Sequence, residues 1–143
     1  MSKEVYDAMD IAEAFAAVAI AVVACDNSVN RDEAHSLRKQ LEHRTPYSGY
    51  SEETVGKLFD NLLAKLRQEG VYTLIDSALS VLTVRQQESA LAMAAQLAYA
   101  DRTISKAERE LLEYLCKQVS IPKQEAQRVV AVIEALNRDS LAH

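Results

Sequence analysis

Apolar residues recur along this chain at the three- and four-residue spacing that lets a helix bury one face. Breakers interrupt the pattern at the segment 43–50, which contains a proline and a glycine, and again at Gly70. Residues that favour helix starts stand at Ser51 and Thr83. The pattern therefore predicts seven helices, over residues of about 4–25, 31–42, 52–69, 71–82, 84–100, 106–119 and 122–137.

The first predicted helix is rich in alanine, whose small side chain lets two helix axes approach closely. Its expected partner is the helix 84–100, which carries alanines at matching positions. The third and last helices each place their large apolar residues on one face. These residues are Val55, Leu58, Phe59, Leu62 and Leu66 in the third helix, and Val129, Val132, Ile133 and Leu136 in the last.

The chain also repeats itself. Residues 21–37 align without a gap with residues 96–112, at an offset of 75 positions (96 − 21). Each copy holds a long helix, a turn and a second helix, with one acidic residue before the turn and one after it. The aligned acidic pairs are Asp26 with Asp101 and Glu33 with Glu108.

The repeat predicts a single all-α domain over residues 1–143, with pseudo-two-fold symmetry. Its two halves, of about 4–69 and 83–138, would each contain three helices, and a short helix of about 71–82 would join them. The composition agrees, since 3 glycines and 2 prolines are too few for a fold of many strands. A length of 143 residues is that of one domain with a substantial core.

The net charge, the cysteines and the hydropathy of the chain indicate which partners and which cellular compartment to expect. A net charge of −5 argues against nucleic acid as a partner, because nucleic acid requires a basic face. Cys25 and Cys116 lack metal-ligand spacing and lie in apolar helical pattern, so we expect two buried, reduced thiols. The apolar stretch 14–25 is too short to span a bilayer, and the acidic residues before it are unlike a signal peptide. We expect a cytoplasmic protein without direct membrane insertion.

The four repeated acids are the candidate functional residues, and two interpretations of them stay open. In the first, they only build the turns: Asp26 and Asp101 close the corners, while Glu33 and Glu108 complete capping boxes. In the second, they ligate a hard divalent cation such as calcium, magnesium or manganese. An EF-hand is excluded, because Arg31 stands where that loop requires glycine.

No catalytic signature occurs in the sequence. The histidines, among them His35, form no ligand pair, and neither a phosphate-binding glycine loop nor a nucleophile elbow is present. We therefore expect no enzymatic activity.

The repeated turn resembles that of a known family. An alanine-rich helix ends in aspartate, a short turn follows, and a glutamate stands three residues after the cap. The strings are YADRTISKAE at residues 99–108 and CDNSVNRDE at residues 25–33. On these strings, and over essentially its whole length, the chain resembles the TerB-like family (tellurite resistance protein TerB).

This resemblance implies a duplicated all-helical domain associated with bacterial tellurite resistance and stress response. It also implies cation binding by acidic residues, which here are Asp26, Glu33, Asp101 and Glu108. The alternative function is a metal-independent interaction scaffold that docks a basic or membrane-associated protein partner, which would hold the chain at the inner face of the membrane. The sequence leaves the oligomeric state open.

Overall fold

The fold is that of a computed structural model, which describes residues 9–25, 31–100 and 103–141, with the backbone alone for residues 31–34. These residues form seven α-helices, a short 3-10 helix and no strand, which confirms the all-α prediction. The α-helices are α2 (Ile11–Ala24), α3 (Arg31–Glu42), α4 (Glu52–Glu69), α5 (Val71–Val81), α6 (Val84–Tyr99), α7 (Lys106–Gln118) and α8 (Lys123–Leu136), and the 3-10 helix is η1 (Tyr47–Gly49).

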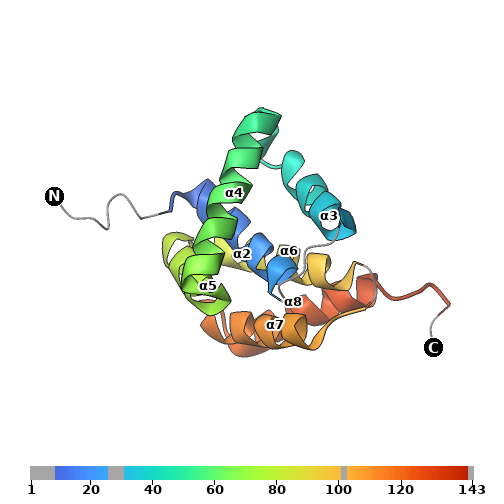
Figure 1. The fold of residues 1–143 in the computed structure, drawn as a ribbon. Helices are drawn as coiled ribbons and strands as arrows, with labels where there is room; N and C mark the ends of the chain where they lie inside the picture. Colours follow the sequence, from blue (N-terminus) through green and yellow to red (C-terminus); the bar gives the residue numbers. More distant parts are fainter. Residues whose placement is uncertain (1–8, 26–30, 101–102, 142–143) are drawn as a thin grey trace.

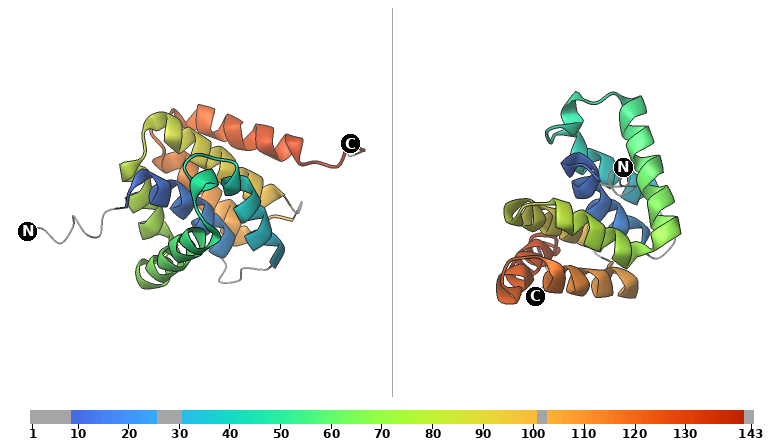
Figure 2. Two further views of the ribbon diagram at one scale, coloured as in Figure 1. Left: turned by 90° about the horizontal axis from the view of Figure 1, so that it is seen from above. Right: turned by 90° about the vertical axis from the view of Figure 1, so that its left-hand side faces the viewer.

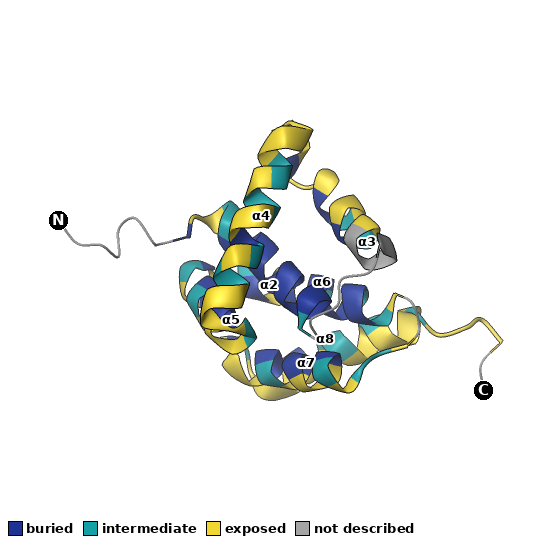
Figure 3. Ribbon diagram, in the orientation of Figure 1, coloured by how far each residue is buried: buried dark blue, intermediate teal, exposed yellow. Residues whose placement is uncertain are grey.

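Helix α2 is the centre of the molecule. Every residue from Ala14 to Ala24 is buried, because α2 is apolar on all sides and is surrounded by other helices. It packs against α5 and α6, as the alanine pattern predicted for α6, and it also contacts α3, α4 and α7. The burial colouring of Figure 3 shows this dark central helix beneath a largely exposed α4.

The remaining helices lie on two sides of this centre. Helices α3 and α4 lie above α2 and α6, whereas α7 and α8 lie below them (Figures 1 and 2). Helix α8 packs against both α6 and α7. Helix α4 contacts α2 and α5, and it diverges from α3. The pair α3–α4 is therefore spread apart over α2, while α7–α8 is packed together.

Two helix starts follow the sequence signals closely. Thr83 and Gln86 form the predicted capping box of α6, with the Gln86 N–H donating to Thr83 Oγ1 at 3.2 Å. The hydroxyl of Ser51 caps α4 by accepting the Thr54 N–H at 3.1 Å. Gly70 ends α4 with φ of 88°, a backbone conformation that costs glycine little.

The start of the first helix was predicted wrongly. A continuous helix was expected from about residue 4, but Met9 and Asp10 are not helical and Asp10 caps α2. The Glu13 N–H donates to Asp10 Oδ1 at 2.8 Å, and the Glu13 carboxylate accepts the Asp10 N–H. Asp10 and Glu13 thus form a capping box. The residues before Asp10 are acidic and continue the helical pattern, so periodicity alone did not locate this helix start.

The buried face of α8 was also predicted wrongly in part. Val132 and Leu136 are 58% and 73% exposed, although they were expected in the core. Val129 and Ile133 pack against the core as predicted, together with Ala126 and Val130, which were not in the predicted face. Helix α8 carries apolar residues on two sides, so its helical period alone could not decide which side is buried.

One buried polar side chain joins two of the connections between helices. Gln87 is 6% exposed, and its Nε2 donates to the carbonyl oxygens of Leu79 and Leu82 at 3.0 and 3.2 Å. Its Oε1 accepts the Ser120 N–H at 2.7 Å. Gln87 therefore ties the α5–α6 turn to the α7–α8 connection.

Candidate functional site

The acidic corners are described only in part. Asp26 and Asp101 lie outside the described residues. Glu33 lies in the first turn of α3, but its side chain also lies outside the description. Glu108 is the one predicted ligand whose side chain is described, and the structure does not test how the four acids are arranged relative to one another.

Glu108 forms the capping box that the sequence predicted. Its N–H donates to Ser105 Oγ at 3.0 Å, and its Oε1 accepts the Ser105 N–H at 2.9 Å. The side chain is nearly buried, with the residue 8% exposed. Among the residues described, no three histidine, cysteine or carboxylate side chains gather as a metal site. The one visible acid therefore acts as a cap, and a cation at this corner would have to share its carboxylate with Ser105.

The two cysteines were expected to be buried thiols, and Cys116 is buried while Cys25 is partly buried. Neither cysteine forms a disulfide. Burial raises the pKa of the Cys116 thiol, and the charge of Glu113 raises it further. Cys116 is therefore a poor nucleophile at neutral pH.

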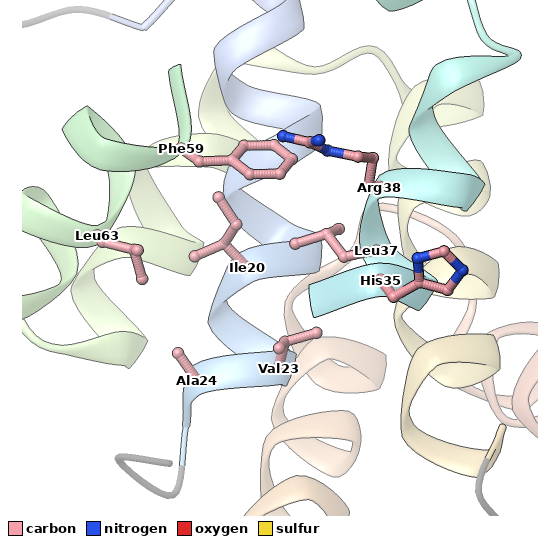
Figure 4. A pocket seen from close by; sticks show the side chains of 8 residues that line it. All are labelled: Ile20, Val23, Ala24, His35, Leu37, Arg38, Phe59 and Leu63. Carbon is pink, nitrogen blue, oxygen red and sulfur yellow. The ribbon is translucent and has the colours of Figure 1, made fainter. Parts of the chain in front are cut away.

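A different hollow stands out as a candidate site. It has a volume of about 280 Å³ and lies between α2, α3 and α4, where the last two helices diverge. We call it the α3–α4 groove. Figure 4 shows the side chains that line it: Ile20, Val23 and Ala24 from α2, His35, Leu37 and Arg38 from α3, and Phe59 and Leu63 from α4.

The α3–α4 groove is lined mainly by apolar side chains and has two polar side chains at its edge. Six of its eight lining residues are apolar, and Arg38 is the only one charged at neutral pH. Arg38 and His35 are exposed, and Arg38 makes no ion pair with any residue that the structure describes. In Figure 4 the Arg38 side chain extends toward Phe59 at the edge of the groove. An apolar group with a negative end is the chemistry that such a surface accommodates.

The loop between α3 and α4 is attached to α2. The Tyr47 ring is buried, packs edge-on against Tyr50 at 5.9 Å between ring centres, and donates its hydroxyl proton to the Ala12 carbonyl. Arg44 lies over the Phe15 ring, 5.2 Å from its centre. These contacts fix the loop on α2, and α3 and α4 leave it in different directions.

A second hollow lies between α6, α7 and α8. Its volume is about 520 Å³, and half of its ten lining residues are charged. Tyr99, at the end of α6, faces Glu134 on α8. Burial first, and then the charge of Glu134 and a hydrogen bond with it, raise the pKa of Tyr99. The charged lining residues are Arg109, Glu113, Lys117, Lys123 and Glu134.

The offsets of the predicted repeat relate part of the lining of one hollow to part of the lining of the other. Helices α2 and α6 end 75 positions apart (99 − 24), α3 and α7 begin at the same offset (106 − 31), and α4 and α8 begin 71 positions apart (123 − 52). With these offsets, five residues of one hollow coincide with five of the other. The pairs are Ala24 with Tyr99, Leu37 with Leu112, Arg38 with Glu113, Phe59 with Val130, and Leu63 with Glu134.

The sequence-based interpretation missed this groove because it looked for chemistry in the acids. The signal was nevertheless present in the aligned repeat, where Ala24 stands opposite Tyr99 and Arg38 opposite Glu113. A small residue and a reversed charge at matching positions indicate that the two halves have diverged in what they contact. The divergence of α3 from α4 depends on tertiary packing and could not be predicted from the sequence.

Comparison with known proteins gives the same family as the turn motifs. The family model described as tellurite resistance protein TerB matches residues 12–138, which covers most of the chain. No curated protein and no solved structure gives a significant match. The match begins in α2 and extends just beyond α8, so it includes both the corners and the α3–α4 groove. This chain belongs to the TerB family of tellurite resistance proteins.

Proposed function

We propose that this TerB-family domain is a non-enzymatic binding module, and that its α3–α4 groove receives the apolar part of a partner molecule. The observation that carries the proposal is a carbon-lined hollow of about 280 Å³ that opens beside Arg38. Its size lies near the lower end of the roughly 300–1,000 Å³ of small-molecule sites. Apolar surface of this kind is stabilised when a partner removes it from water.

The helices around the groove support this role. Leu62 is the one fully buried residue of α4, whereas Phe59 and Leu63 are only partly buried. Helix α4 is thus anchored to the core through Leu62, while its partly buried side chains Phe59 and Leu63 line the groove. A protein partner would insert an apolar side chain there, and a small amphiphile would insert its hydrocarbon.

A neutral, fluorescent, apolar dye such as N-phenyl-1-naphthylamine tests the proposal without assuming the natural partner. We expect saturable binding at one site per chain, with a rise in fluorescence. Leu63→Glu places a carboxylate in the groove wall and should weaken binding at least tenfold. The matched control is Leu136→Glu, because Leu136 is 73% exposed on α8 and does not line the groove.

Two results would count against a binding module. One is the absence of saturable dye binding to the unaltered protein. The other is equal dye affinity in the Leu63→Glu and Leu136→Glu variants. Circular dichroism of each variant establishes that it is folded.

The cation hypothesis for Asp26, Glu33, Asp101 and Glu108 keeps a separate test. Calcium, magnesium or manganese would stabilise the corners by neutralising carboxylates that otherwise repel each other. A titration with calcium or magnesium, followed by amide NMR, should shift resonances confined to residues 25–34 or 100–109. No response at millimolar cation would leave the acids with a capping role alone.

A further inference from the structure

We propose that the ligand of the α3–α4 groove is a free aliphatic monocarboxylate of the fatty acid class, with its hydrocarbon between α2, α3 and α4 and its carboxylate at Arg38. This inference rests on the proposed function and specifies its ligand. It is carried by the difference between the two equivalent hollows of the molecule.

The first step concerns the lining. In the second half, Tyr99 at the end of α6 and Glu134 on α8 line the same hollow, and burial and then the charge of Glu134 raise the pKa of Tyr99. The equivalent residues of the first half are Ala24 and Leu63, whose side chains are apolar. The first half therefore lacks both the ring and the carboxylate that the second half supplies from its own chain. The first hollow is thus apolar where the second carries a phenol and a carboxylate, which favours a ligand with an apolar body.

The second step concerns the charge. Arg38 corresponds to Glu113, so the charge on this wall is reversed between the halves. Arg38 is the only charged side chain among the eight groove residues that are described, and it makes no ion pair with another described residue. A guanidinium group binds carboxylates with two parallel hydrogen bonds. The polar end of the ligand is accordingly an anion.

The third step concerns shape and the kind of apolar group. The walls are mainly aliphatic, from Ile20, Val23, Leu37 and Leu63, with Phe59 on one side. A neighbouring hollow of about 150 Å³ shares Arg38 and Phe59 with the first, but Glu42 and Glu52 are among its lining residues, so the aliphatic space is that of the first hollow alone. A flexible hydrocarbon chain of modest length suits these aliphatic walls better than a rigid multi-ring compound.

The experiment compares two amphiphiles with the same tail and opposite charge. Decanoate and decyltrimethylammonium, both below their micelle concentrations, displace N-phenyl-1-naphthylamine from the full-length chain. We expect decanoate to bind about five- to tenfold more tightly, as a partly exposed ion pair supports. Each methylene added between octanoate and decanoate should improve affinity by up to about fourfold.

Three variants assign the effect to residues. Arg38→Gln should abolish the preference for decanoate, while Arg67→Gln, on an exposed part of α4 outside the groove, should retain it. Ala24→Tyr combined with Leu63→Glu gives the first half the phenol and the carboxylate of the second and should abolish binding of decanoate and of dye. Should that double variant not fold, Leu63→Glu alone should abolish the preference for decanoate, because its carboxylate balances the charge of Arg38.

The outcomes separate this inference from the proposed function. Equal affinity for the two amphiphiles, or a preference that survives Arg38→Gln, overturns the carboxylate ligand while dye binding upholds the binding module. Amide NMR shifts on decanoate that map to α7 and α8 also overturn the inference. Failure of both dye and decanoate to bind overturns the inference and the proposed function together.

Discussion

Gln87 is the buried polar side chain that ties the α5–α6 turn to the α7–α8 connection, and replacing it gives a measurable prediction. The change is Gln87→Leu, which keeps a similar volume and removes all polar atoms. Three hydrogen bonds are lost, two from Nε2 to the carbonyls of Leu79 and Leu82 and one from Ser120 N–H to Oε1. The α5–α6 turn and the α7–α8 connection then lose their shared partner.

The magnitude follows from which groups remain unsatisfied. The Leu79 carbonyl keeps a bond from the Leu82 N–H at 3.3 Å, so its loss is the smaller. The Leu82 carbonyl loses a buried hydrogen bond, and a buried unsatisfied group costs about 1–3 kcal/mol. The Ser120 N–H belongs to an exposed residue and can bond to water instead, so its loss costs less. The added apolar burial of leucine offsets roughly 1 kcal/mol. We expect the free energy of unfolding to fall by about 1–2 kcal/mol.

Urea unfolding followed by far-ultraviolet circular dichroism measures this loss. With a slope of about 2 kcal/mol per molar urea, the midpoint should move down by about 0.5–1 M. The control is Gln118→Leu, because Gln118 is exposed and lines the same shallow surface beside Gln87. A Gln87→Leu midpoint equal to that of the unaltered protein, or equal losses in both variants, would refute the reasoning.

Two further predictions concern the corner and the loop. Ser105→Ala should lower the free energy of unfolding by about 1 kcal/mol, whereas Glu108→Gln should cost less because its amide oxygen still accepts the Ser105 N–H; equal losses in thermal unfolding would contradict the capping box. Burial, with Tyr50 and Asp10 adding to it, raises the pKa of Tyr47 above its ordinary value of 10.0. The folded state therefore holds this proton more tightly, and stability that is complete below pH of about 10 is lost as the pH rises further. Tyr47→Phe should reduce that loss between pH 9 and 11 in urea unfolding, and an unchanged pH dependence would contradict it.

Local signals in the sequence predicted most of the helices. The capping residues Ser51, Thr83 and Ser105 each begin a helix where they were expected, because a cap depends on residues only three positions away. Gly70 ended α4 for an equally local reason. Asp10 was missed because the acidic residues before it continue the helical pattern of the chain.

The packing of the helices against one another was harder to predict from the sequence. Which side of α8 is buried depends on α6 and α7, so Val132 and Leu136 could not be assigned from periodicity alone. The α3–α4 groove depends on how α3 and α4 are placed over α2, and no local pattern encodes that placement. The substitution of Ala24 for Tyr99 between the repeats was nevertheless visible, and it indicated where the halves differ.

The central claim is that one half of this TerB-family domain keeps an apolar hollow where the other half has a charged one. Methyl NMR under xenon pressure tests it without any assumed ligand, since xenon enters apolar cavities of this kind. We predict saturable shifts for the methyl groups of Ile20, Leu37 and Leu63, and none for those of Leu112 and Val130. Absent shifts at the first three residues, or equal shifts in both halves, would contradict the claim.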